Sequence, residues 1–238
     1  MTLTEGLALA AGTTAPLLLL DPPAALAVAG AAVAGAADDL AGGASAKGLR
    51  GHLAALRQGR VTTGVLKIAI LGATGLGACA WSDRRQDAGA DRRHDAGAHG
   101  RHGTGSAAFT LTGAALVAGS ANLANLFDLR PGRALKVALV SGIPLLATGR
   151  PAAAAVTGAG LAVLPGDLRG VSMLGDTGAN PLGAAVGLAA AQSLGPRGRL
   201  LALTAVAGLV LASEKVSFSR VIDQAPVLRA LDRWGRRA

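Results

Sequence analysis

Long apolar stretches alternate with short polar segments along the whole chain. A membrane-spanning helix needs about 20 mainly apolar residues, and most of these stretches approach that length. Proline, which is tolerated in the first turn of a helix, stands at or near the start of several of them. The sequence therefore predicts an all-α fold, a polytopic transmembrane helix bundle of about eight spans. The expected spans are residues 3–20, 22–37, 62–81, 106–122, 134–149, 151–166, 177–194 and 200–213.

The amino-acid composition favours a bundle in lipid over a soluble domain. Of the 238 residues, 51% are apolar but only 2% are aromatic, and 35 are glycines. Small residues let helices pack closely in a membrane, whereas a soluble core of this size is usually filled by larger side chains. The charged residues are also segregated into the segments between the apolar stretches, as in the loops of a membrane protein.

The basic residues indicate an orientation. The net charge is +9, but the basic side chains are spread over many short loops without interleaved aromatic residues, so we expect no nucleic-acid partner. By the positive-inside rule, the loops richer in Lys and Arg face the cytoplasm. We therefore expect a multi-pass protein of the cell membrane with both termini cytoplasmic, and a homo-oligomer is compatible with the sequence. The cytoplasmic set includes Lys47, Arg50, Arg57, Arg60, Arg130, Arg133, Lys136, Arg169 and Lys215.

Two polar segments differ from the rest of the chain. Residues 82–105, within the bundle predicted over residues 1–214, are rich in Gly, Ala, Arg, Asp and His, and we expect a disordered outer loop there. Its histidines are more typical of a solvated linker than of a metal site. Residues 215–238 place apolar side chains at helical spacing among arginines, which predicts a cytoplasmic amphipathic tail helix. This helix either lies on the membrane leaflet or docks onto the bundle.

The first candidate for chemistry is the pair Asp38 and Asp39, directly after the second apolar stretch. Carboxylates at the C-terminal end of a helix oppose its dipole, so capping does not explain them. Adjacent carboxylates also repel each other, and a Mg²⁺ ion, which prefers oxygen ligands, would relieve that repulsion. The alternative is a pair of solvated loop acids.

Two further polar groups interrupt the apolar pattern, and the predicted topology brings them to the same side of the membrane. Asn122, Asn125 and Asp128 recur at intervals of three residues, which keeps them near one face of a helix end. Asp176 lies between Gly175 and other small residues just before the seventh span, where glycine allows a tight turn and close approach of a ligand. The alternative for both groups is helix capping.

A glycine-rich stretch offers a competing interpretation. The segment from Lys67 through Gly72 and Gly75 is similar to the phosphate-binding turn of dinucleotide-binding domains. Such a turn must open an amphipathic helix that leads to a second strand, but the low-complexity segment of residues 82–105 follows instead. A glycine-rich membrane span is therefore the preferred interpretation.

Taken in order, the three polar groups resemble the motifs of the polyprenyl-phosphate N-acetylhexosamine-1-phosphate transferase superfamily. Asp38 and Asp39 resemble its paired acids, and the segment around Asp176 is similar to its Met-Gly-Asp-x-Gly element. The group from Asn122 to Asp128 matches its Asn-x-x-Asn-x-x-Asp element. The resemblance covers most of the chain and implies transfer of a sugar-1-phosphate from a UDP-sugar to a polyprenyl phosphate, with Mg²⁺ as cofactor.

The resemblance also implies a role for each group. Asp38, Asp39 and Asp176 would be the catalytic and metal-binding residues. The lysine expected to contact a phosphate is Lys47, in the basic loop after the paired acids. The residues expected to bind substrate are Lys47, Asn122, Asn125, Asp128 and Gly175.

The chain departs from the family pattern in its last cytoplasmic loop. The segment around Glu214 and Lys215 stands where the family carries a histidine cluster. Asp128 is followed by Leu-Arg-Pro-Gly rather than by a second Asp-Gly repeat. The alternative function is therefore a catalytically silent relative that binds the lipid phosphate or a nucleotide. A small transporter would need a polar path across the bilayer, which the predicted spans do not contain.

Overall fold

The computed structural model describes residues 4–41, 48–94 and 106–236, and within them 84% of the chain is helical and no strand occurs. The all-α prediction is therefore confirmed. The helices are α1 (Thr4–Leu20), α2 (Pro22–Ala41), α3 (Gly48–Arg57), α4 (Thr63–His94), α5 (Ala107–Phe127), α6 (Arg133–Leu146), α7 (Pro151–Asp167), α8 (Gly175–Ser193), α9 (Pro196–Ser213), α10 (Phe218–Gln224) and α11 (Pro226–Arg233).

Four of these helices are long and apolar enough to cross a membrane. They are α2 as far as Leu40, α4, α5 and α9. Each of the other expected spans is a helix, but α1, α6, α7 and α8 are too short or not apolar enough to be counted with them. The structure thus supports a membrane protein with four candidate spans, and the figure of about eight spans stays a prediction.

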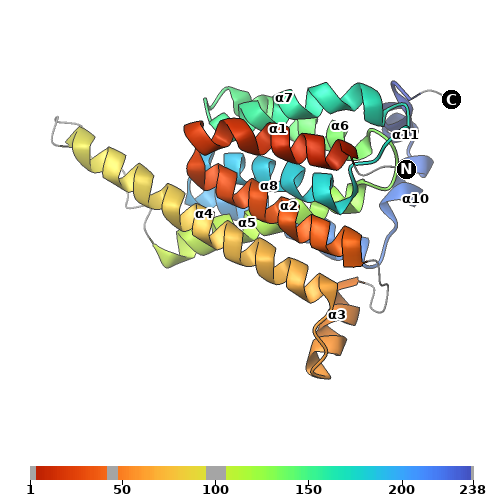
Figure 1. Cartoon of the computed structure of the whole chain (residues 1–238), viewed down its shortest axis with the longest axis horizontal. Helices are drawn as coiled ribbons and strands as arrows, with labels where there is room; N and C mark the ends of the chain where they lie inside the picture. Colours follow the sequence, from red (N-terminus) through yellow and green to blue (C-terminus); the bar gives the residue numbers. More distant parts are fainter. Residues whose placement is uncertain (1–3, 42–47, 95–105, 237–238) are drawn as a thin grey trace.

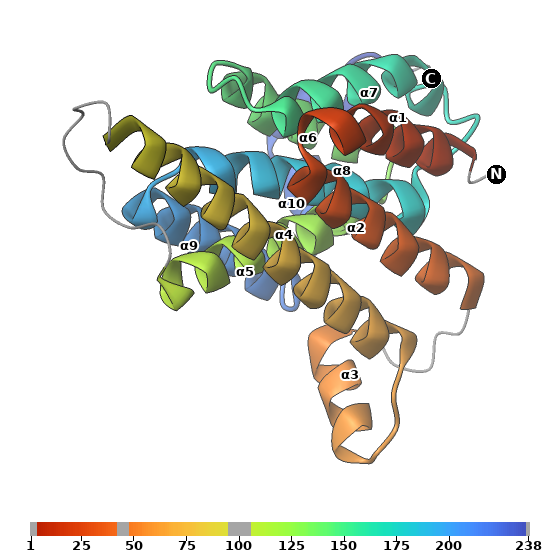
Figure 2. The ribbon, with the colours of Figure 1, turned by 60° about the vertical axis from the view of Figure 1, so that its left-hand side comes forward.

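Helix α8 lies at the centre of the bundle and is buried along nearly its whole length. It packs against α1, α2, α5 and α7, which surround it in Figures 1 and 2. Small residues make this close packing possible. A Cβ atom added at Gly183 would lie 2.1 Å from the carbonyl oxygen of Ser120 on α5, and one added at Gly35 on α2 would lie 2.1 Å from the carbonyl oxygen of Asp176.

Helix α4 is longer than predicted and projects beyond the other helices (Figure 1). The expected disordered loop of residues 82–105 was therefore wrong over residues 82–94, which are helical; the remainder lies outside the described residues. One reason is a contact across the bundle: Asp83 is only 2% exposed and pairs at 2.9 Å with Arg199 of α9. This pair anchors the first turn after the apolar part of α4, and the Ala, Arg and Gln residues beyond it are good helix formers.

The tail forms two short helices instead of one. Proline cannot continue the hydrogen-bond pattern of α10, and the chain is extended at Ala225, before Pro226 begins α11. Both helices contact the bundle. The ring of Phe218 stacks on that of Phe127 at a centroid distance of 4.9 Å, and Asp232 is only 6% exposed against Arg133. Of the two arrangements left open by the sequence, docking onto the bundle is present.

Candidate functional site

The three polar groups that the sequence singles out meet at one end of the bundle. Asp38 and Asp39 lie in the last turn of α2, and Asp128 is the residue that ends α5. Asp176 lies in the first turn of α8. Because α8 packs against both α2 and α5, these acids from distant parts of the sequence become neighbours.

Lys67 of α4 connects two of these acids. Its ammonium group forms an ion pair with the carboxylate of Asp176 and lies 3.5 Å from a carboxylate oxygen of Asp38. The side chain of Lys67 is 8% exposed, whereas those of Asp38 and Asp176 are 28% and 20% exposed. The two carboxylates thus flank a buried cation while remaining partly open to the exterior.

The second acid of the pair has a different task. The Asp39 carboxylate accepts hydrogen bonds from the backbone N–H groups of Asp176 and Thr177, at 3.2 and 2.9 Å. It also accepts one from the Thr177 hydroxyl at 2.6 Å. These bonds satisfy free amides at the N-terminus of α8, where negative charge is also favoured by the helix dipole. Asp39 therefore caps a helix after all, but a helix that begins far away in the sequence.

The turn before α8 depends on Gly175. Its φ angle is +58°, in the left-handed region that glycine enters without steric cost. This conformation confirms the tight turn predicted around the glycine. It lets the backbone turn into α8 with the N–H groups of the first turn directed at Asp39.

Asp128 joins the second motif to the third. The pKa of Asp128 is raised to about 7, chiefly by burial and then by the nearby carboxylate of Asp167, while a hydrogen bond from the Gly175 N–H group opposes the rise. The pKa of Asp176 is likewise raised, to about 6, because burial outweighs the opposing effect of Lys67. The site therefore holds two carboxyl groups that exchange protons near neutral pH.

The remaining predicted residues are Asn122, Asn125 and Lys47. Asn122 and Asn125 are half-buried on the last two turns of α5, on the approach to Asp128. Lys47, the expected phosphate contact, lies outside the described residues.

Two residues of the site were not on the expected list. Lys67 lies between the acids. In the sequence it ends the basic loop after the paired acids, whose cations are expected near a pyrophosphate, and it begins the glycine-rich stretch, but it is not among the expected site residues. Its signal was a lone cation inside an apolar stretch, which is rarely left unpaired in a membrane protein. Asp167, 1% exposed at the end of α7, accepts a hydrogen bond at 2.8 Å from the backbone N–H of Gly132, just after Asp128. No sequence pattern ties it to the site.

Two of the three predicted metal ligands face the same position, and a cationic side chain holds it. Asp38 and Asp176 offer carboxylate oxygens, which Mg²⁺ prefers, and the cationic Lys67 group already stands between them. Asp39 is occupied by the α8 amides. Across the described ranges, no three His, Cys, Asp or Glu side chains are grouped as a metal site, so Mg²⁺ held by all three predicted acids stays a prediction.

The chain matches no protein-family model, no curated protein and no solved structure. The function has to be argued from the site itself: a buried lysine between two carboxylates, with a third acid nearby, at one end of an apolar helix bundle.

Proposed function

We propose that the protein is a membrane phospho-sugar transferase of cell-envelope glycan biosynthesis, which moves a sugar-1-phosphate from a UDP-sugar to a polyprenyl phosphate and releases UMP. The observation that carries this proposal is the meeting of Asp38, Lys67 and Asp176 at the end of an apolar bundle. At such a position a soluble nucleotide sugar and the headgroup of a lipid phosphate can reach the same side chains.

The chemistry requires charge to be neutralised more than it requires a reactive side chain. An oxygen of the lipid phosphate attacks the phosphorus that carries the sugar, and the bond from that phosphorus to UMP breaks. Phosphoryl transfer of this kind is accelerated mainly by positioning and by positive charge. Lys67 supplies such a charge, and Asp38 and Asp176 would hold Mg²⁺, which neutralises phosphate oxygens when bound.

The second motif supports recognition of the nucleotide. Asn122 and Asn125 offer amide donors and acceptors, and Asp128 offers a carboxyl group with a pKa of about 7. Groups of these kinds can hydrogen-bond to uracil and ribose. Because Asp128 is linked through Gly175 to the turn that bears Asp176, a bound nucleotide would lie beside the proposed metal ligands.

One observation favours a second function, a catalytically silent relative that binds a lipid phosphate or nucleotide. Lys67 already neutralises one of the two charges of Asp38 and Asp176, and Asp39 is used to cap α8. With its acids engaged in this way, the site offers few free carboxylate oxygens to a metal, and a silent relative would lack the metal-dependent step.

Purified protein in lipid nanodiscs, incubated with undecaprenyl phosphate, Mg²⁺ and a set of UDP-sugars, distinguishes the two. The transferase releases UMP and forms a lipid-linked sugar, and both products disappear with EDTA and in Asp176→Asn. The control is Arg197→Gln, an exposed charge in the first turn of α9, which should retain activity. Binding of UDP-sugar without any UMP release would favour the silent relative, and neither binding nor release would reject both.

A further inference from the structure

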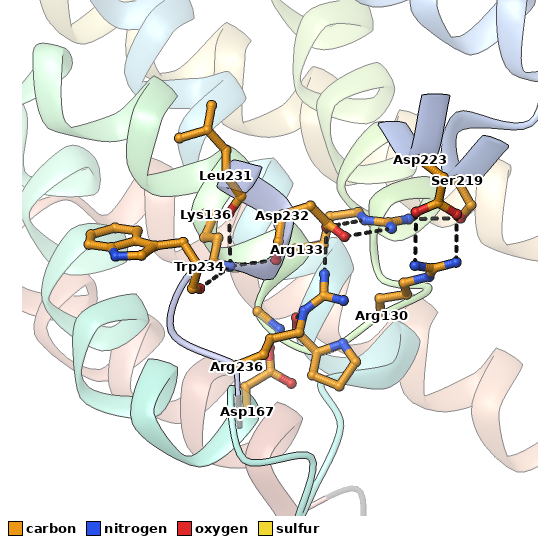
Figure 3. A network of polar contacts seen from close by, with 12 residues as sticks. Arg130, Arg133, Lys136, Asp167, Ser219, Asp223, Leu231, Asp232, Trp234 and Arg236 are labelled. Atoms are coloured by element: carbon orange, nitrogen blue, oxygen red, sulfur yellow. Dashed lines mark hydrogen bonds and ion pairs between the residues drawn. The ribbon is translucent and has the colours of Figure 1, made fainter. Parts of the chain in front are cut away.

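The two tail helices are fixed to the bundle by an ionic network, drawn in Figure 3. Arg133, 3% exposed at the start of α6, donates to both carboxylate oxygens of Asp232 at 2.7 and 3.2 Å. It also donates to the hydroxyl of Ser219 at 2.8 Å, so one arginine holds α10 and α11 together. Arg130 adds a two-pronged pair with Asp223, at 2.9 and 3.1 Å.

The C-terminal end of α11 is fixed as well. Lys136 donates to the backbone carbonyl oxygens of Asp232 and Trp234, at 2.8 and 2.6 Å. Arg236 donates at 2.8 Å to the carbonyl oxygen of Pro131, in the turn before α6. Cations at the C-terminus of a helix satisfy its free carbonyl groups. The polar face of the tail is therefore the face that binds the bundle.

This arrangement leaves the apolar face of α11 uncovered. Val227, Leu231 and Trp234 follow one another at helical spacing, and they are 72%, 58% and 76% exposed. Leu228, on the same side, is 45% exposed. A soluble protein would bury such a face against its core, but here the buried residue of α11 is the charged Asp232.

Position and charge indicate what covers this face. The candidate span α9 ends at Ser213 and α10 begins at Phe218, so the tail lies within a few residues of the end of a candidate membrane span. Arg220, Arg229 and Arg233 are exposed on the tail. Exposed arginines around a row of apolar residues that ends in tryptophan suit the boundary between headgroups and acyl chains, where anionic lipids attract cations.

We propose that α10 and α11 form a rigid docking surface for an anionic lipid leaflet, with Val227, Leu231 and Trp234 entering the headgroup region and the exposed arginines pairing with lipid phosphates. This surface is independent of the proposed transferase reaction. The tail differs from a flexible amphipathic segment, because the ionic network fixes the orientation of α10 and α11 before they contact lipid.

Tryptophan fluorescence tests the proposal in the full-length protein. The chain has two tryptophans, Trp81 and Trp234, so Trp81→Phe leaves Trp234 as the single reporter. The protein is reconstituted in vesicles of phosphatidylcholine, with or without phosphatidylglycerol. We expect Trp234 to emit at shorter wavelength in the anionic vesicles, and to be quenched there by lipids brominated near the headgroup rather than by aqueous iodide.

A pair of matched variants tests the part played by charge. Arg229→Gln with Arg233→Gln should abolish the difference between the two vesicle types, as should high salt, which screens surface charge. The control, Arg84→Gln with Arg197→Gln, removes two exposed charges that lie outside the tail, on α4 and α9, and should leave the difference intact.

Two results would overturn the proposal. Quenching by iodide in both vesicle types would mean that the face remains in water. Shielding of Trp234 that disappears when the protein is diluted into more lipid of the same composition would mean that a second copy of the chain covers the face. Shielding that survives dilution and depends on phosphatidylglycerol supports the docking surface.

Discussion

The carboxylate of Asp39 accepts hydrogen bonds from the backbone N–H groups of both Asp176 and Thr177, the latter at 2.9 Å. Asp39 and Asp176 are 137 positions apart in the sequence. One side chain of α2 thereby completes the first turn of α8, the central helix of the bundle. The acid pair and the glycine turn are held at fixed separation by this contact, whatever ligand the site binds.

The capping bond can be tested through stability. Asp39→Ala should lower the free energy of unfolding by about 1 kcal/mol or somewhat more, because the first amides of α8 lose their acceptor. Asp39→Asn keeps an oxygen acceptor and should lose much less. Denaturant unfolding in detergent measures both. Equal loss in the two variants would mean that the charge, rather than the hydrogen bonds, matters.

Replacement of Asp176 tests the shared site. Asp176→Asn preserves size and should leave the protein folded and inserted, but it should abolish Mg²⁺-dependent ligand binding or turnover, with Asp38→Asn nearly as severe. Titration with Mg²⁺ and UDP-sugar measures this directly. If Asp176→Asn bound metal and nucleotide as well as the parent protein, the two acids would not share an ion.

Lys67 should control the protonation of its neighbour. Burial raises the pKa of Asp176 and the Lys67 ammonium group opposes that rise, leaving the pKa at about 6, so Lys67→Met should move it higher. The protonated carboxyl band in infrared spectra, recorded against pH, measures the midpoint of this titration. The double variant Lys67→Met/Asp176→Asn lacks the Asp176 carboxyl group and identifies its part of the band. An unchanged or lower midpoint would contradict the contact between Lys67 and Asp176.

Asp128 should make stability depend on pH. Its pKa is raised from 3.8 to about 7 on folding, so the unfolded chain loses this proton first as pH increases. The contribution of Asp128 to stability is complete below about pH 4 and is lost as pH rises through 7. Thermal unfolding should show the parent protein losing stability over this range, by up to a few kcal/mol, relative to Asp128→Asn. Parallel pH profiles would contradict the raised pKa.

Close helix packing gives a prediction away from the site. Gly183→Ala should destabilise the bundle by about 1–3 kcal/mol, because the new methyl group meets the Ser120 carbonyl oxygen on α5. Gly208→Ala, on α9, is the matched control: its added Cβ meets nothing within 4 Å, and higher helix propensity should leave stability unchanged or raised. Similar loss in both variants would argue against the tight contact of α5 with α8.

The sequence predicted the helices and the meeting of the motifs better than the role of each residue. Spacing placed Asn122 through Asp128 on one helix end, and alternation of apolar and polar segments placed Asp38 and Asp176 at the same end of the bundle. Both inferences use local pattern and topology, which a single sequence contains.

The contacts made across the bundle were not predictable. Asp39 was expected to be unrelated to capping because only its own helix could be considered, and its partners lie on α8. Lys67 belongs to no motif of its own. It matters because α4 packs beside α2 and α8, which brings its ammonium group to Asp38 and Asp176. The helical course of residues 82–94 depends similarly on Arg199, which lies more than a hundred residues later.

The buried pair of Asp83 and Arg199 also has a consequence for the order of assembly. Arg199 is 1% exposed and donates to Asp83 and to backbone carbonyl groups of Phe109 and Ala191. During synthesis α4 is made long before α9, so Asp83 can accept the 2.8 Å hydrogen bond from the Thr110 hydroxyl of α5 early, but its cationic partner comes only after the helices between them. A buried carboxylate without a partner is strongly destabilising. The bundle therefore cannot close fully around α4 until α9 has arrived, which makes this late helix the step that commits the nascent chain to its final packing.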